Sequence, residues 1–220
     1  MIDKIIDTDL VKKYGYNAGA SEVGIVSSSA FNSAPTGFKP LDVLKSCFSV
    51  IVLGTPFPKE ALSMNTSDYT DIRNTMVSKI DNIAKEVAKL IKSKGFQTKV
   101  IGSVNTKGYN GPISLKHAAE LAGLGIIGRN YLLTNKKYGN LLFFSAVLTN
   151  AELVPDKKAE YMNCDYCYKC VEICPAKALN NPDLFNKKEC AKVCIKIDKK
   201  VEYRCYLCRK VCPNSLGIEK

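Results

Sequence analysis

Apolar residues in the first two thirds of the chain follow patterns typical of both strands and helices. Two runs rich in β-branched residues, 23–26 and 49–53, predict buried strands. Between residues 69 and 94, apolar side chains recur every three or four positions and Gly95 follows, which predicts an amphipathic helix. A second helix is expected to begin near Ser114, because serine is favoured at N-caps.

Polar stretches separate these elements. Residues 27–40 are rich in Ser, Pro and Gly and predict a loop, whereas 132–134 and 141–149 flank a polar segment and predict a hairpin. Residues 151–160 are polar and predict a linker. Strands and helices are mixed without strict alternation, so we expect an α+β fold.

The N-terminus gives no sign of export or membrane insertion. Its first ten residues carry three acids and no long apolar run, whereas a signal peptide needs a basic start and a continuous apolar stretch. No segment approaches the roughly 18 apolar residues of a membrane span. We therefore expect a cytoplasmic protein without membrane contact, in a compartment where disulfides are rare.

Cysteine usage divides the chain into two regions. The protein has 220 residues and ten cysteines, and nine of these fall between Cys164 and Cys212. The cysteine-rich region has few long apolar residues, so bound metal would have to supply its folding free energy. We expect domains at 1–155 and 156–220, the second smaller and holding metal.

The cysteine spacing is typical of bacterial four-iron ferredoxins. The two sets are Cys164-x2-Cys167-x2-Cys170-x3-Cys174-Pro175 and Cys205-x2-Cys208-x3-Cys212-Pro213. In such a pair, the cysteine before each proline ligates the other cluster. A structural zinc ribbon accounts for Cys-x2-Cys pairs, but not for the further cysteines or the two Cys-Pro steps.

This crossover logic assigns the ligands. We expect one 4Fe-4S cluster, called cluster 1, on Cys164, Cys167, Cys170 and Cys212. A second, cluster 2, is expected on Cys174, Cys205 and Cys208 with one further ligand. Spacing alone leaves both Cys190 and Cys194 as candidates for that ligand.

Three other features suggest chemistry less strongly. Gly123, Gly125 and Gly128 match the dinucleotide fingerprint, but they follow a helical stretch rather than a strand, so we expect close backbone approach to a flat cofactor or helix-to-sheet packing. His117, the one histidine, is either a functional group or a structural side chain. Cys47 is expected to be a small buried apolar residue.

The segment GPISLKHAAELAGLGIIGRN (residues 111–130) resembles the core motif of epoxyqueuosine reductases and related reductive-dehalogenase-like proteins. As in that family, a segment like LLTNKKYG (132–139), a segment like VLTNAEL (147–153) and a two-cluster cysteine domain follow. The resemblance runs from about residue 19 to residue 213 and is specific from Gly111 onward.

The resemblance implies a nitroreductase-like, mixed α/β N-terminal domain that binds a cobamide and receives electrons from two 4Fe-4S clusters. It implies Cys190 as the missing ligand of cluster 2. The family's proton-donating aspartate corresponds to Tyr109 here, and dehalogenases of the wider group use a tyrosine as the acid. Tyr109 is therefore either the proton donor or a packed aromatic. From the resemblance we expect a short form of the family, without the C-terminal helical-repeat extension of the tRNA-modifying enzymes.

The net charge of +11 indicates which kinds of partner to expect. Basic residues are spread along the chain, with 18 basic and 11 acidic residues before Ala151 and 14 and 10 from there on. Such a distribution suits an acidic electron donor such as ferredoxin or flavodoxin. A corrinoid protein or tRNA are further partners, although no RNA-binding motif supports tRNA.

Two functions are consistent with these features. The first is an iron–sulfur oxidoreductase that passes electrons to a cobamide for a reaction related to epoxyqueuosine reduction or dehalogenation. The second is an electron-transfer or reductive-activation protein with no substrate of its own, acting on a corrinoid protein or another partner.

Overall fold

The structure is a computed structural model of the chain and describes residues 6–104, 111–160, 164, 166–181, 184–197 and 201–217. By packing, the chain divides into two compact units, each made of separate segments. Unit 1 comprises residues 1–55, 77–124 and 143–159, and unit 2 comprises residues 56–76, 125–142 and 160–220. The domains expected at 1–155 and 156–220 stay a prediction, because this division follows packing rather than chain order.

Unit 1 is built on a four-stranded sheet with the order β1-β2-β6-β3. Its strands are β1 (Glu22–Ser27), β2 (Ser49–Pro56), β3 (Thr98–Ile101) and β6 (Leu142–Thr149). β1 runs antiparallel to β2, and β3 runs antiparallel to β6. The two central strands are buried along nearly their whole length, so both of their faces must be covered.

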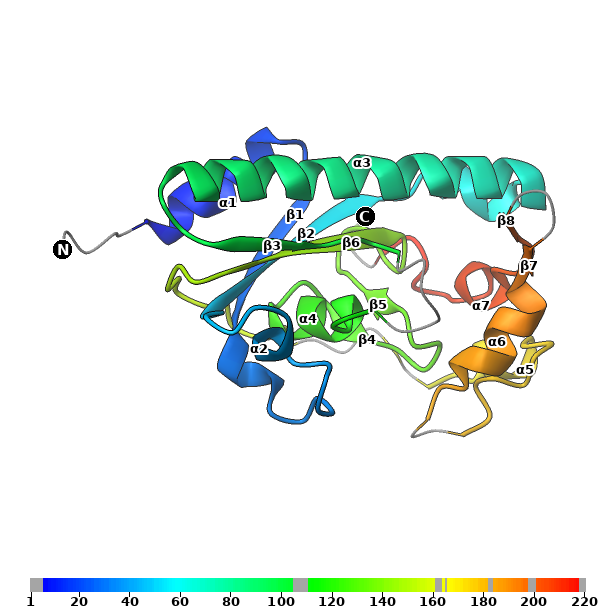
Figure 1. The fold of residues 1–220 in the computed structure, drawn as a ribbon. Helices are drawn as coiled ribbons and strands as arrows, with labels where there is room; N and C mark the ends of the chain where they lie inside the picture. The colour runs from blue at the N-terminus through cyan, green and yellow to red at the C-terminus, as the bar shows by residue number, and fades with distance from the viewer. Residues whose placement is uncertain are drawn as a thin grey trace. The chain divides into compact units, whose positions relative to one another are not determined.

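Helices cover the two faces of this sheet (Figure 1). One face packs against α1 (Thr8–Asn17) and the part of α3 (Thr66–Ser93) that belongs to unit 1, and α4 (Leu115–Leu121) lies on the other. The main core lies between the sheet and the first two helices, where Val11, Ile80 and Val87 pack with Ile51. The apolar residues of α3 recur every three or four positions and so form a stripe along one side of the helix, which packs into this core.

The short elements of unit 1 complete this packing. The predicted loop at 27–40 contains η1 (Ser28–Phe31), and α2 (Pro40–Val43) follows it. Residues 151–160 form no regular element, but they are not a free linker. Asp156 accepts a hydrogen bond from the Ile25 amide and forms an ion pair with Lys12. Ala151 and Leu153 are buried.

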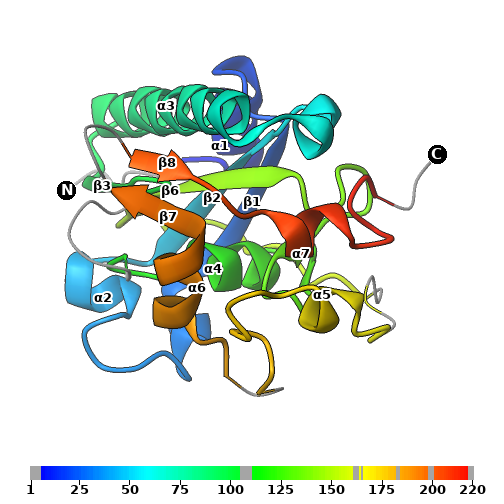
Figure 2. The ribbon, with the colours of Figure 1, turned by 90° about the vertical axis from the view of Figure 1, so that its right-hand side faces the viewer.

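Unit 2 has little regular structure. It contains the two-stranded pairs β4 (Ile126–Ile127) with β5 (Leu133–Thr134) and β7 (Ile195–Ile197) with β8 (Val201–Tyr203). Its helices are η2 (Lys59–Ser63), the first turns of α3, α5 (Lys169–Glu172), α6 (Lys187–Cys194) and α7 (Leu207–Lys210). Figure 2 shows α6 leading directly into the β7–β8 hairpin.

The structure confirms both early strands and the long helix, but the hairpin expected from 132–134 and 141–149 is wrong. β5 pairs with β4, and β6 joins the central sheet between β2 and β3. The segment between them closes on itself, because the Asn135 side chain accepts from the amides of Lys137 and Tyr138. Residues 142–149 are apolar on both faces and therefore belong in the buried sheet.

The mixture of helices and strands agrees with the expected class. A nitroreductase-like, cobamide-binding first domain stays a prediction. Among the described residues, no helix has the length and apolar character needed to cross a membrane.

Candidate metal centre

Four thiols line one pocket in unit 2. They belong to Cys164, Cys167, Cys170 and Cys212, the four residues expected to hold cluster 1. The pocket contains about 390 Å³ of empty space, part of it open to solvent. Two segments that are distant in sequence, 164–170 and 212–214, therefore meet in the wall of one pocket.

Burial and mutual proximity change the acidity of these thiols. Burial raises the pKa of Cys170, and the neighbouring Cys164, Cys212 and Cys167 raise it further. Burial also raises the pKa of Cys212, to which Cys164 and Cys167 contribute. Such thiols stay protonated at neutral pH until a metal displaces their protons.

The other four expected ligands form a second group. Burial raises the pKa of Cys208 to about 12; Arg209 opposes this shift, and Cys190, Cys205 and Cys174 add to it. Burial likewise raises the pKa of Cys205, with contributions from Cys190 and Cys174. The assignment of these four cysteines to cluster 2 stays a prediction.

Cys194 lies at the edge of this second group. It is the last residue of α6, one helical turn after Cys190, and the two sulfur atoms are 3.8 Å apart. A hydrogen bond from the Cys190 thiol lowers the pKa of Cys194, while burial and the nearby Cys205 and Cys208 oppose that shift. Cys190 as the eighth ligand therefore stays a prediction.

The tip of the β4–β5 hairpin holds both cysteine groups. The Arg129 amide donates to the Cys164 sulfur at 3.4 Å, and the Asn130 side chain donates to the Cys208 carbonyl at 3.1 Å. The tip keeps its shape because the Gly128 amide donates to the Leu132 carbonyl. Sequence reasoning gave this hairpin no role beyond Gly128.

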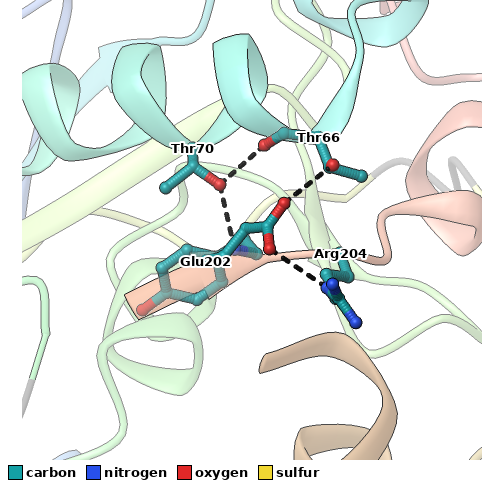
Figure 3. Close-up of polar contacts among 5 residues, drawn as sticks. Thr66, Thr70, Glu202 and Arg204 are labelled. Atoms are coloured by element: carbon teal, nitrogen blue, oxygen red, sulfur yellow. Dashed lines mark hydrogen bonds and ion pairs between the residues drawn. The ribbon is translucent and has the colours of Figure 1, made fainter. Parts of the chain in front are cut away.

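The strand that precedes Cys205 is fixed to the first turns of α3 (Figure 3). The Thr70 hydroxyl accepts from the Tyr203 amide at 2.9 Å and donates to the Thr66 carbonyl at 2.7 Å. The Glu202 carboxylate accepts from the Thr66 hydroxyl at 3.0 Å and pairs with Arg204 at 3.1 Å. These contacts place β8, and with it the start of the second cysteine set.

Aromatic side chains from the same elements pack beside the second group. The rings of Tyr69 and Tyr206 stack with centroids 4.0 Å apart, and the Tyr206 hydroxyl donates to the Met64 carbonyl. The Arg73 guanidinium lies 3.5 Å from the Tyr203 ring centroid. By contrast, Tyr166 and Tyr168 are half exposed, and Tyr168 lines the pocket of the four cysteines.

Two of the three glycines for which we expect either a cofactor contact or helix-to-sheet packing lie against protein backbone. A β-carbon at Gly123 would lie 2.2 Å from the Lys157 carbonyl oxygen, and one at Gly125 would lie 2.4 Å from that of Thr134. Gly128 is closest to the site, because a β-carbon there would lie 3.7 Å from the Cys164 sulfur. Cofactor binding by these glycines stays a prediction.

The remaining candidates lie outside these two groups. Tyr109, the expected proton donor, is outside the described residues. His117 is exposed on α4, and its Nδ1 lies 2.7 Å from the Ser114 hydroxyl. Ser114 is at the predicted N-cap, but its side chain makes no capping bond to the backbone. Cys47 is buried and donates to the Ser49 carbonyl, as expected of a structural residue.

The donor set fits an iron–sulfur cluster. Four thiols surround a pocket whose wall also contains the buried cation Arg129, so a cluster with four thiolates would meet a complementary charge. Among the described residues, no three His, Cys, Asp or Glu side chains converge closely enough to hold a single metal ion. The cobamide expected from the resemblance has no counterpart among these contacts.

No protein-family model matches the chain, but curated proteins and solved structures do. An epoxyqueuosine reductase of Bacillus subtilis is 24% identical over 247 aligned positions, which cover 93% of this chain and 62% of that protein. One of Lactococcus garvieae is 34% identical over 111 positions, which cover 46% of this chain and 31% of that protein. The chain is thus similar in sequence to epoxyqueuosine reductases.

Solved structures agree with this relationship at the level of the fold. A crystal structure of epoxyqueuosine reductase with an epoxyqueuosine-modified tRNA stem loop matches with a TM-score of 0.67 and 21% identity, over 96% of this chain and 66% of that one. A reductive dehalogenase structure, described as suggesting a mechanism for B12-dependent dehalogenation, matches with a TM-score of 0.60 and 20% identity, over 76% and 24%. This chain thus spans less than two thirds of the length of the first epoxyqueuosine reductases that it matches.

Proposed function

We propose that the protein is an iron–sulfur oxidoreductase in which two 4Fe-4S clusters pass electrons to a cobamide in the N-terminal domain. The observation that carries the proposal is the pocket lined by Cys164, Cys167, Cys170 and Cys212, because the arrangement matches ferredoxin spacing across two distant segments. The reaction is a reduction related to that of epoxyqueuosine or of an organohalide.

The residues of unit 2 have distinct roles in this proposal. Cluster 1 is held by the four pocket cysteines. Cluster 2 is held by Cys174, Cys190, Cys205 and Cys208. Each cluster supplies one-electron transfer when bound. The tip of the β4–β5 hairpin holds the two ligand sets in position, because Arg129 contacts Cys164 and Asn130 contacts Cys208.

The relatives support the rest of the proposal. Epoxyqueuosine reductases suggest a reductase, the structure with a tRNA stem loop suggests a tRNA substrate, and the dehalogenase described as B12-dependent suggests a cobamide. Tyr109 would be the proton donor to the reduced substrate. A small acidic protein, ferredoxin or flavodoxin, would supply the electrons to this basic chain.

A second candidate is an electron-transfer or reductive-activation protein with no substrate of its own. The observation that favours it is Tyr109, which stands where the family has its proton-donating aspartate. Such a protein would use the same clusters to reduce a corrinoid protein or another partner.

Metal analysis of the anaerobically purified full chain tests the clusters. We expect about eight irons and eight acid-labile sulfides per chain. Zinc at about two per chain would contradict the central proposal. Cys47→Ser is the matched control, since Cys47 lies in unit 1 and should not alter the iron content.

Serine substitutions distinguish Cys190 from Cys194. We expect Cys190→Ser to lose cluster 2 or to replace its normal electron paramagnetic resonance (EPR) signal, and Cys194→Ser to retain eight irons and both signals. Loss with Cys194→Ser alone would assign the eighth ligand to Cys194.

Titration with a cobamide separates the two candidate functions. A shift in the cobamide absorption spectrum at micromolar protein, with reduction of the cobalt on addition of a low-potential donor, supports the reductase. An unchanged spectrum at tens of micromolar favours the electron-transfer protein.

A further inference from the structure

Arginine is confined to the unit that contains the clustered cysteines. The chain has four arginines, at positions 73, 129, 204 and 209, and all of them lie in unit 2, whereas lysines occur throughout the chain. Arginine keeps its charge when buried and offers a rigid set of donors, so it suits buried ion pairs better than lysine does. The arginines of unit 2 are therefore candidates for charge compensation at the metal centre.

Arg129 is the most unusual of them. It lies at the tip of the β4–β5 hairpin, is only 5% exposed and forms part of the pocket wall together with the four cysteines of cluster 1. Its Nη2 donates to the Leu179 carbonyl, but Nε and Nη1 have no hydrogen-bond partner among the described residues. None of the described residues that line the pocket is acidic.

An unpaired cation in this position is costly. Burying a charge without a partner destabilises a protein by several kcal/mol, so buried charges are normally paired or bound to a group of opposite sign. Among the described residues, the atoms around Arg129 supply one carbonyl and no carboxylate, and the guanidinium carbon lies 5.9 Å from the centroid of the Tyr168 ring. An anion in the pocket would supply the partner that Nε and Nη1 do not find among these residues.

We propose that Arg129 is the counter-charge and hydrogen-bond donor of cluster 1 and that it raises the reduction potential of this cluster. The inference rests on the proposed function, because it requires a cluster in the pocket. A 4Fe-4S core with four thiolates is an anion that gains one further negative charge when a donor gives it one electron. A fixed cation stabilises the reduced form more than the oxidised form.

The guanidinium also differs from the other cation of the pocket. Lys169 lines the same pocket but is exposed, so water screens its charge. The Arg129 amide already donates to the Cys164 sulfur, and free N–H groups of the side chain in the same wall can donate to further sulfur atoms. Hydrogen bonds to cluster sulfurs raise the reduction potential in the same direction as the charge.

A redox titration followed by EPR tests the proposal on the full chain loaded with iron and sulfide. In Arg129→Gln, we expect one of the two cluster potentials to fall, so that the ratio of reduced to oxidised cluster at a fixed potential drops at least tenfold, or 59 mV for a one-electron step. The other cluster and the Lys169→Gln control should shift by much less. An Arg129→Gln shift no larger than that of Lys169→Gln overturns the proposal.

Arg129→Lys separates charge from packing. It keeps the charge but loses the rigid fork, so its potential should lie between those of the wild type and Arg129→Gln. If Arg129→Gln does not load iron but Arg129→Lys does, charge compensation is supported. If neither variant loads iron, the guanidinium has a structural role and the proposal is wrong.

The failure of this inference can be told from that of the proposed function. A wild-type chain without iron contradicts the proposed function. A wild-type chain with about eight irons and an unchanged potential in Arg129→Gln contradicts only the role of Arg129.

Discussion

At the scale of single residues, the structure depends on places where the backbone has no room for a side chain. Gly123 has a positive φ of 75° and lies against the carbonyl of Lys157, so the turn after α4 packs onto the segment that follows the central sheet. Both partners are backbone atoms of unit 1. A side chain at position 123 can therefore be accommodated only by moving the chain.

Gly123→Ala should destabilise unit 1 strongly. Gly37 is the matched control, because its φ is also positive, at 90°, but nothing lies within 4 Å of its absent β-carbon. We expect Gly37→Ala to lower the free energy of unfolding by about 1 kcal/mol through backbone strain alone. Gly123→Ala should lower it by clearly more. Equal losses in denaturant titrations would contradict the close approach.

Cys47 predicts a pH dependence. Burial raises the pKa of Cys47 to about 11, whereas the pKa of a cysteine in an unfolded chain is about 8.5. Between these values the unfolded chain releases a proton that the folded protein keeps, so the free energy of unfolding falls as the pH rises. Denaturant titrations at pH 8 and 10 should show a larger fall for the wild type than for Cys47→Ala. An equal fall in the free energy of unfolding for both proteins would show that burial does not raise the pKa of Cys47.

At this scale, a residue's role could be predicted from the sequence only where neighbouring residues in the chain form a recognisable motif. The cysteines could be assigned because the spacing of the ligands is part of the motif. Arg129 could not, since its importance arises from burial beside residues far along the chain. The confinement of arginine to unit 2 could not have pointed to it from the sequence, because that unit is defined by packing and not by chain order.

At the scale of elements, the metal centre depends on two connections to regular structure. The β4–β5 hairpin reaches both cysteine sets, and β8 is tied to the start of α3. Both elements are short, so their positions depend on these side-chain contacts more than on strand pairing.

Thr70→Val tests the second connection. Thr70 is buried, and its loss would leave the Tyr203 amide without its partner, at a cost of about 1–3 kcal/mol. Thr75→Val is the matched control, because Thr75 makes the same bond to the carbonyl one turn earlier on α3 but is exposed. We expect faster loss of iron to a chelator in Thr70→Val only. Identical rates would show that this contact does not hold the site.

The long helix was predictable and the hairpin pairing was not, for one physical reason. The stripe of α3 repeats within each turn, so a short window of sequence contains it. The partner of a strand is set by distant residues, and the run at 141–149 is equally suited to a hairpin or to a buried sheet. Burial inside the sheet decided between them.

At the scale of the whole molecule, the two units have different sources of stability. Unit 1 contains a continuous apolar core between its sheet and helices. The described part of unit 2 has short elements, and its large buried apolar side chains are Phe57, Tyr69, Leu133, Leu141, Leu142 and Leu179. The proposed clusters, when bound, would help to offset the conformational entropy of folding this unit.

Removal of the metal should therefore affect the units unequally. After chelation under reducing conditions, we expect faster amide hydrogen exchange in residues 125–142 and 166–217 and little change in β1, β2 and α1. Re-addition of iron and sulfide should restore protection. Equal loss of protection in both units would contradict an independent core in unit 1.

The segmented make-up of unit 2 also has a consequence for how the protein is synthesised. Residues 56–76 and 125–142 leave the ribosome before the cysteines with which they pack, whereas the strands of unit 1 can begin to pair as soon as they emerge. Apolar residues such as Phe57 and Leu141 then stay exposed to solvent until residues 160–220 have been synthesised. If the chain holds the proposed clusters, iron delivered late would prolong this exposed stage, so the supply of clusters would limit the yield of folded protein.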